Sequence, residues 1–482
     1  MIRSRLLAAS LLAAALLLES CSRPAPADPR MVAAWMQAMY GAFRVERVSP
    51  PVASRLLVYS TAALYSGLAA ADPQMKPLGA SLNRFPVLPA PEKGVEYDAT
   101  FLSVAAERVV MDSLLHEGLP TTRAAMNRLA DSLEAARLKA GARDATRARS
   151  EELGRRIGLG IVEWSRTDGF TATRGRKYLP PAGPGLWVND APGNTFAQQN
   201  LSGASEFVGL DNPANIMKAG TVSDRGLILN RPKRAGLATL PPVNMSGMSE
   251  PYWGEVKPFV LNSWNECAIP APYAYSADSA ADAYHDAMAV YRTRAGLTPD
   301  QRAIALYWAD NAGESGTPVG HWISIASQMV SEKNMNAPDA ARTMVLTASA
   351  MADAFIASWG YKYQHNFLRP RPYIRAMIDS TWEPLIATPP FPEYPSGHST
   401  QSAAAATVLT SVLGTIAFED STGLSIGSPV RHFTSFDAAA EEAGMSRVYG
   451  GIHFPNANVN GRRLGQCIGH RVVERFTATS KP

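Results

Sequence analysis

Three short segments late in the chain carry the residue types that could do chemistry. The middle segment, "PSGH", places Ser396, Gly397 and His398 between a proline and an alanine-rich run, a pattern that predicts the start of a helix. The backbone N–H groups of Ser396 and Gly397 would then lie at the positive end of a helix dipole, where proteins commonly hold anions. Gly397 lets a ligand approach the backbone closely, and His398 lies where it could transfer a proton.

A basic pair precedes this segment, and a second arginine and histidine follow it. In "KYQHNFLRPRP", Lys362 and Arg369 are seven positions apart, about two helical turns, so both cations can lie on one helix face. In "MSRVYGGIHFP", a turn-like stretch with two glycines separates Arg447 from His453. Each pair alone also fits an ordinary role, namely a solvated basic face or a buried core histidine.

Taken together, the three segments suit a tetrahedral or trigonal-bipyramidal oxyanion. They supply three cations, a hydroxyl, a backbone amide at a helix start and two imidazoles. The members of this set are Lys362, Arg369, Ser396, Gly397, His398, Arg447 and His453. The cations would neutralise the anion's oxygens, while one histidine bonds to its central atom and the other transfers protons.

The rest of the chain must position these residues, and its patterns are mostly helical. Apolar residues recur at helical spacing in an N-terminal region, 31–170, and in a C-terminal region, 273–482. Between them, residues 171–272 are rich in Gly, Pro, Asn and aromatic residues and predict an irregular, loop-rich region. No segment alternates like a strand. We therefore predict a mainly α fold of helical bundles, with the anion-binding active site in the C-terminal bundle.

Composition excludes several classes of protein. Of the 482 residues, 46% are hydrophobic and 18% charged, which is typical of a globular protein and not of a disordered or membrane-embedded one. The formal net charge of +4 is spread along the chain, so charge gives no reason to expect a nucleic-acid partner.

The N-terminus, "MIRSRLLAASLLAAALLLESCS", predicts export. Two arginines precede an apolar stretch too short to span a membrane comfortably, as in a signal peptide, here residues 1–21, with a linker at 22–30. The ending "LESC" resembles the lipobox of bacterial lipoproteins, which implies a lipid on Cys21, although Glu19 is unusual there. Ordinary signal cleavage nearby is the alternative. Either way we expect a periplasmic or cell-surface protein that meets the membrane only through such a lipid.

Two further cysteines, Cys267 and Cys467, remain if Cys21 carries lipid. In an oxidising compartment they could form one disulfide, or both could be small buried residues. Their spacing does not match a metal site.

The segments "KYQHNFLRP", "PSGH" and "SRVYGGIH" resemble, in order and spacing, the signature of the vanadium-dependent haloperoxidase and type 2 phosphatidic acid phosphatase superfamily. The stretches "SPPVASRLLVYSTAALY" and "WNECAIPAPYAYSA" through "ADAFIASW" resemble its secreted bacterial haloperoxidase-like branch. The resemblance implies that His453 ligates vanadium, or attacks phosphorus in phosphatases, and that His398 is the acid–base residue. The residues that it implies for binding the oxyanion are Lys362, Arg369, Ser396, Gly397 and Arg447.

One position departs from the family pattern. The third motif usually continues to an acidic residue four positions past its histidine, and here that residue is Ala457. The usual carboxylate would orient the imidazole and raise its basicity. Asn456 or Asn458 could hydrogen-bond instead, but an amide stabilises an imidazolium less well. We therefore expect His453 to lack a charged partner, which would harm a nucleophile more than a metal ligand.

Two enzymatic functions and one binding function follow. In a vanadium haloperoxidase, His453 would anchor vanadate, His398 would move protons and Lys362 would polarise hydrogen peroxide, which oxidises a halide that then reacts with a small organic acceptor. In an acid-phosphatase-like phosphomonoesterase, His453 would form a phosphohistidine, with phosphate as product. A protein that binds phosphate or vanadate without turnover is the third.

The haloperoxidase is the favoured interpretation. The chain shows no transmembrane helices of the kind that lipid phosphatases of this superfamily carry, and its large N-terminal half resembles haloperoxidases. Ala457 also argues against a nucleophilic histidine. Trp359 and Phe391 match aromatic positions near the haloperoxidase halide site, although aromatics there often serve only the core. A homodimer is compatible with this family.

Overall fold

The computed structural model of the chain describes residues 26–189 and 250–478. The predicted signal peptide at 1–21, with Cys21, lies outside the described residues, as does part of the predicted loop-rich region. Among the residues that are described, no helix is both long and apolar enough to cross a membrane.

The predicted mainly α fold is confirmed. In the first part of the chain, helices begin where the sequence places proline or a capping residue, as at Asp98, whose carboxylate accepts from the backbone N–H groups of Thr100 and Phe101. These helices are α2 (Arg30–Val45), α3 (Pro50–Ala71), α4 (Ala99–Leu114), α5 (Pro120–Lys139), α6 (Asp144–Ser165) and the short α7 (Phe170–Thr173), with a 3-10 turn, η1 (Leu78–Ala80).

The second part of the chain is helical as well, with one small hairpin. Its helices are α9 (Asp282–Ala295), α10 (Pro299–Tyr307), α11 (Thr317–Glu332), α12 (Ala337–His365), α13 (Pro370–Met377), α14 (Gly397–Leu413), α15 (Phe436–Tyr449) and α16 (Pro455–Ala478), with 3-10 turns η3 (Trp253–Glu255) and η4 (Thr422–Ile426). Strands β1 (Phe418–Asp420) and β2 (Arg431–Phe433) pair antiparallel. The predicted absence of strands is wrong for this hairpin, because three-residue strands are too short to show alternation in the sequence.

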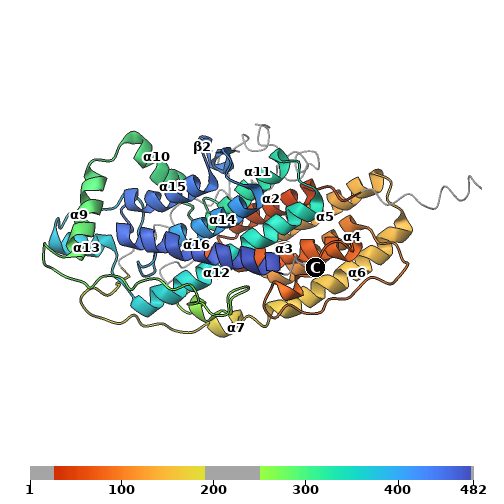
Figure 1. The fold of residues 1–482 in the computed structure, drawn as a ribbon, viewed down its shortest axis with the longest axis horizontal. Coiled ribbons are helices and arrows are strands. Elements are labelled where there is room, and N and C mark those ends of the chain that lie inside the picture. Colours follow the sequence, from red (N-terminus) through yellow and green to blue (C-terminus); the bar gives the residue numbers. More distant parts are fainter. Residues whose placement is uncertain (1–25, 190–249, 479–482) are drawn as a thin grey trace, which may run out of the picture.

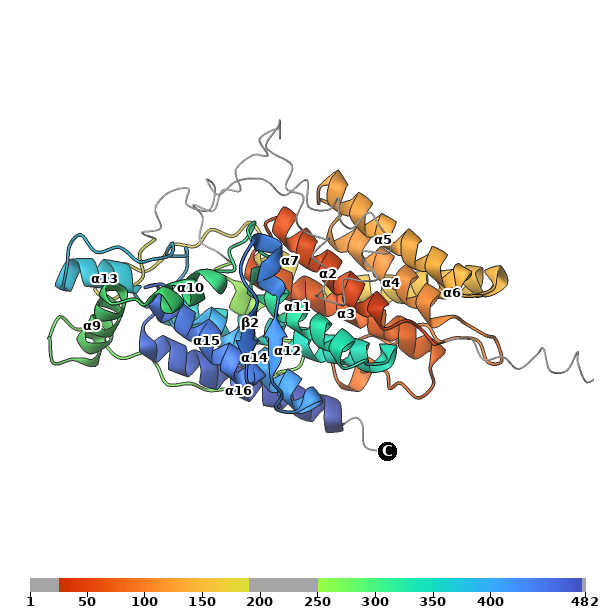
Figure 2. The same ribbon diagram turned by 90° about the horizontal axis from the view of Figure 1, so that it is seen from above.

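The helices form one elongated body with a shared core (Figures 1 and 2). α2 packs against α11 and α3 against α12, so the predicted N-terminal region contributes to the same hydrophobic core as the C-terminal bundle. α4, α5 and α6 lie at one end of the molecule, and α9 and α13 lie at the other (Figure 1).

Helices α14 and α16 pack closely because glycines on α16 face α14. These glycines recur every four residues, at Gly461, Gly465 and Gly469. A Cβ at Gly461 would lie only 2.7 Å from the backbone oxygen of Ser396. This packing brings the start of α14 beside the start of α16, and the N–H of Ser396 donates to the carbonyl of Ala457 at 3.1 Å.

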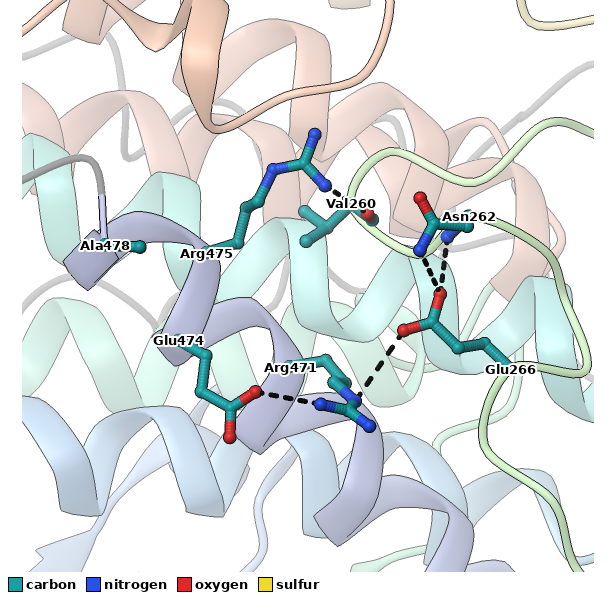
Figure 3. A pocket seen from close by; sticks show the side chains of 7 residues that line it. All are labelled: Val260, Asn262, Glu266, Arg471, Glu474, Arg475 and Ala478. Atoms are coloured by element: carbon teal, nitrogen blue, oxygen red, sulfur yellow. Dashed lines mark hydrogen bonds and ion pairs between the residues drawn. The ribbon is translucent and has the colours of Figure 1, made fainter.

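Cys267 and Cys467 form a disulfide, which decides between the two alternatives for this pair. The bond joins the segment before α9 to α16. Beyond it, the end of α16 and the segment around Asn262 form a pocket with a charged lining (Figure 3). Arg471 is 3.1 Å from Glu474 and 3.6 Å from Glu266 there, so its charge is already paired. None of the predicted site residues lines this pocket.

Candidate active site

The structure brings all seven predicted site residues together at helix ends of the C-terminal bundle. They occupy the last turns of α12 and α15 (Lys362 and Arg447), the positions before α13 and α14 (Arg369 and Ser396), the first turn of α14 (Gly397 and His398) and the turn before α16 (His453). Burial lowers the pKa of His453 well below its ordinary value, and the neighbouring charges of Arg369, Lys362 and Arg447 lower it further.

His453 has a charged partner, so the prediction that it lacks one is wrong. Its Nδ1 lies 2.8 Å from Oε1 of Glu393, and both side chains are buried. The same carboxylate oxygen accepts the backbone N–H of Phe454 at 2.9 Å. This geometry assigns the imidazole proton to Nδ1 and leaves a lone pair on Nε2. An imidazole held in this way is oriented for metal ligation or for nucleophilic attack.

Glu393 was missed because it lies 60 positions before His453, outside the segment where the family places its carboxylate. A signal was present in the sequence, since Glu393 is the one charged residue in the stretch "PPFPEYP", which ends directly before Ser396. Ala457, at the family's usual position, is fully buried in an apolar cluster and uses its carbonyl to hold Ser396. The carboxylate is thus supplied by the segment before α14 instead of by α16.

The three cations are almost completely buried. Lys362 and Arg369 are 0% exposed and Arg447 is 2% exposed. Burial lowers the pKa of Lys362 well below its ordinary range, and Arg369 lowers it further. Burial, followed by the charge of Arg369, lowers the pKa of Arg447 to about 10, against the opposing effect of Asp310. A bound anion would offset the electrostatic repulsion between these buried cations.

Backbone carbonyls, rather than carboxylates, hold two of these cations in place. Lys362 Nζ donates to the carbonyls of Pro392, Glu393 and Pro395 at 3.0, 2.9 and 2.5 Å. The Arg369 guanidinium donates to the carbonyl of Ile452 at 2.8 Å and lies 3.0 Å from His453 Nε2. Carbonyl dipoles fix these groups without cancelling their charge, so the site is preorganised for an anion.

Glu393 is the carboxylate that faces this pair. Burial raises its pKa to about 7, while Arg369 and Lys362 act in the opposite direction. Two charged groups among the described residues shift the pKa of Lys362. The positive charge of Arg369 lowers it, and the negative charge of Glu393 raises it. The site around His453 therefore keeps an excess of positive charge.

The start of α14 offers a hydroxyl and an amide. The side chain of Ser396 caps α14 by accepting from the backbone N–H of Ser399 at 3.4 Å, and its hydroxyl also lies 2.9 Å from Ser399 Oγ. The backbone N–H of Ser396 is used by Ala457, so the prediction that it holds an anion is wrong. The N–H of Gly397 is a first-turn amide, which has no acceptor within its helix. A Cβ at Gly397 would lie 3.2 Å from the Trp359 ring, so the chain fits here most easily without a side chain.

His398 is suited to accept a proton. Its Nε2 is buried and has no partner among the described residues. Burial lowers the pKa of His398 well below its ordinary value, the charges of Arg447 and His321 lower it further, and a hydrogen bond to the backbone of Trp308 opposes them. His398 is therefore neutral near pH 7, as a general base must be.

The two predicted aromatic residues form a wall over the cations. The rings of Trp359 and Phe391 are 4.9 Å apart. Lys362 Nζ lies 5.2 Å from the centre of the Phe391 ring, and the Arg369 guanidinium carbon lies 4.9 Å from it. These are cation–π distances, so the wall shields the cations from solvent.

The donor set fits orthovanadate or orthophosphate. It combines three buried cations, the Ser396 hydroxyl, a first-turn amide and an imidazole nitrogen whose lone pair faces Arg369. The cations, the hydroxyl and the amide favour the oxygens of an oxyanion, and the imidazole nitrogen can bond to its central atom.

Known proteins share this arrangement of segments. A family model described as the VCPO second helical-bundle domain matches residues 342–481, which contain all seven site residues. Over 184 residues the chain is 31% identical to the vanadium chloroperoxidase of Curvularia inaequalis, a match that spans 31% of this chain and only 30% of that protein.

Two solved structures resemble the whole fold. A bacterial vanadium-dependent iodoperoxidase has a TM-score of 0.76 and 29% identity, covering 94% of this chain and 98% of that one. A bacterial vanadium-dependent chloroperoxidase has a TM-score of 0.61 and 15% identity over 95% of this chain and 99% of that one, and shares the fold. The iodoperoxidase fits the predicted bacterial branch. The chain thus belongs to the superfamily of vanadium-dependent haloperoxidases and type 2 phosphatidic acid phosphatases.

Proposed function

We propose that this protein is a vanadium-dependent haloperoxidase that oxidises a halide with hydrogen peroxide. The observation that carries the proposal is the burial of Lys362, Arg369 and Arg447 around the oriented imidazole of His453. Vanadate, when bound, supplies a Lewis-acid centre that activates peroxide toward attack by a halide. The protein's own contribution is charge, orientation and proton transfer.

Each site residue has a role in this proposal. His453 would hold the anion through Nε2, because Nδ1 is occupied by Glu393. Arg369, Arg447 and the hydroxyl of Ser396 would bind its oxygens together with the Gly397 amide. Lys362 would act mainly through its charge, because its three hydrogens are directed at backbone carbonyls. His398, neutral and with no partner for Nε2 in the described part of the chain, would take a proton from peroxide and return it to the departing oxygen.

Iodide is the halide that we propose first. The wall of Trp359 and Phe391 beside buried cations suits a large, polarisable and weakly hydrated anion. The bacterial relative with 29% identity is an iodoperoxidase, which supports the same choice. A small organic molecule would accept the oxidised halogen.

A phosphomonoesterase is the second candidate, and Glu393 is the observation that favours it. The objection drawn from Ala457 no longer holds, because Glu393 orients His453 for attack on phosphorus. The new N–P bond would form a phosphohistidine, and His398 would protonate the alkoxide that leaves. The lowered pKa of His398 weighs against this candidate, because a histidine that is neutral near pH 7 does not hold the extra proton that the leaving alkoxide needs.

A side-by-side assay separates the two functions. Iodide oxidation and monochlorodimedone bromination are followed with orthovanadate and peroxide, and p-nitrophenyl phosphate hydrolysis is followed without vanadate. We expect halide oxidation that needs vanadate and that is lost in Lys362→Ala but kept in Lys257→Ala, a matched change at an exposed lysine. Phosphate release with no halide oxidation would support the phosphatase instead. Tight anion binding with neither activity would indicate a non-catalytic binding protein.

We also propose that the protein is exported and anchored by a lipid on Cys21. The proposal rests on the signal-like N-terminus ending in "LESC". Wild-type protein should fractionate with membranes, and Cys21→Ser should be released in soluble form. Folded protein that keeps Met1 in the cytoplasm would contradict export.

A further inference from the structure

A buried histidine outside the predicted set lies between two aspartates. His321, near the start of α11, is 2% exposed. Its Nδ1 lies 3.0 Å from an Asp310 oxygen, and its Nε2 lies 2.8 Å from an Asp420 oxygen. Because both ring nitrogens face carboxylates, both donate, and the ring is an imidazolium. Burial opposes this charge, but Asp310 and Asp420 outweigh it and raise the pKa of His321 to about 10.

Trp308 connects this histidine to the candidate active site. The rings of Trp308 and His321 are stacked, with centroids 4.3 Å apart and planes 15° apart. Trp308 is also fixed by its indole N–H, which donates to Glu442 at 3.0 Å. Its backbone carbonyl accepts a hydrogen bond from Arg447 and one from His398. Arg447, which we assign to anion binding, and His398, which we assign to proton transfer, therefore depend on the position of one carbonyl.

The turn that carries Trp308 has an unfavourable backbone conformation. Asp310 has a φ of 48° and Thr317 a φ of 65°, in the left-handed region that a β-branched residue such as threonine strongly disfavours. Ser315 partly supports the turn, since its hydroxyl donates to Asp310 at 3.1 Å and accepts from the Thr317 N–H at 3.2 Å. Backbone strain persists only where surrounding contacts enforce it, and it gathers at functional sites. His321 supplies such a contact by binding Asp310.

We propose that His321 is a positioning residue for the anion site. Clamped between Asp310 and Asp420, its ring fixes Trp308, and the Trp308 carbonyl then sets the positions of Arg447 and His398. This inference rests on the proposed function, because it assumes that Arg447 binds an oxyanion on which His398 acts. A merely structural histidine would affect folding but not the affinity of the folded protein for an anion.

The test is titration calorimetry of the full chain with orthovanadate and with orthophosphate, alongside thermal unfolding. His321→Gln should weaken the binding of both anions by roughly ten-fold or more, the usual effect of losing a residue that orients a ligand-binding group. The matched control is His432→Gln, at a histidine whose side chain is 71% exposed and 3.4 Å from Glu419, and it should bind like the wild type.

A double variant distinguishes the loss of charge balance around position 321 from a general loss of structure. His321→Gln leaves two buried carboxylates without their cation, and adding Asp420→Asn removes one of them and restores a donor for the glutamine oxygen. The double variant should recover part of the lost affinity. Asp420→Asn alone keeps the histidine and changes no residue of the anion site, so it provides a milder test should His321→Gln not fold, and it should also weaken binding.

The possible outcomes are distinct. Folded His321→Gln or Asp420→Asn protein with wild-type affinity would overturn the role of His321. Wild-type protein that binds neither anion would overturn the proposed function itself, and the role of His321 with it.

Discussion

Nδ1 of His453 lies 2.8 Å from Oε1 of Glu393, although 60 positions separate the two residues along the chain. The short segment that contains Glu393 also supplies the three carbonyls that hold Lys362. One segment directly before α14 thus fixes a cation through its backbone and orients the anchor imidazole through its side chain. This dual use explains how the site can be assembled with alanine at position 457.

Removing the charge of Glu393 should weaken anion binding. In Glu393→Gln the amide oxygen can still accept from His453 Nδ1, but it no longer stabilises positive charge on the ring. We expect the dissociation constant for orthovanadate to rise by about 10–100-fold, measured by calorimetry. Glu383→Gln is the matched control, because Glu383 is half-exposed and its partners among the described residues are Arg371 and Arg375, outside the site. Equal affinities in both variants would show that Glu393 does not serve the site.

A carboxylate at the family's usual position should not tighten anion binding by this protein. Ala457 is 0% exposed in an apolar cluster, and the ring nitrogen that such a carboxylate would bind is already held by Glu393. Ala457→Asp should therefore destabilise the fold by about 2 kcal/mol or more without tightening the binding of orthovanadate. Thermal unfolding and calorimetry on the same preparation measure both effects. Tighter binding at unchanged stability would mean that the bond from His453 to Glu393 is weaker than its geometry indicates.

The charge on His321 makes stability depend on pH. The pKa of His321 is about 10 in the folded protein, above its ordinary value of 6.5, so its stabilising contribution is complete below pH 6.5 and is lost as the pH rises toward 10. We expect the free energy of unfolding to fall between pH 7 and 10 by more in the wild type than in His321→Gln, with a difference on the order of a few kcal/mol. Urea denaturation at both pH values, with the disulfide intact, measures it. The same decline in both proteins would contradict a charged His321.

The sequence predicted what depends on local pattern. Helical periodicity predicted the mainly α fold, and short motifs identified Lys362, Arg369, Arg447 and the two histidines of the site. The helix face predicted to carry both Lys362 and Arg369 is wrong, because α12 ends at His365 and Arg369 lies directly before α13. Glu393 was missed because its contact with His453 joins two distant segments, and the spacing of residues along the chain does not predict such long-range contacts. The pairing of His321 with two aspartates was missed for the same reason.

The partners of backbone N–H groups outside regular helices could also not be predicted from the sequence. The N–H of Ser396 was expected to hold an anion, but it donates to Ala457 because the glycines of α16 allow α14 to pack closely. Cysteine spacing alone does not predict whether two cysteines meet, so the sequence is compatible with both a disulfide and two separate buried thiols. Folding brings Cys267 and Cys467 together across 200 positions.

In the proposed site, His453 anchors an oxyanion while His398 serves only proton transfer. The most direct test measures the orthovanadate dissociation constant of the wild type, His453→Ala and His398→Ala by calorimetry, with halide oxidation assayed in parallel. We predict that His453→Ala loses tight binding, whereas His398→Ala keeps binding within a few-fold and loses roughly 10²–10⁴-fold in turnover. Orthovanadate binding by His453→Ala that is as tight as in the wild type would contradict the account.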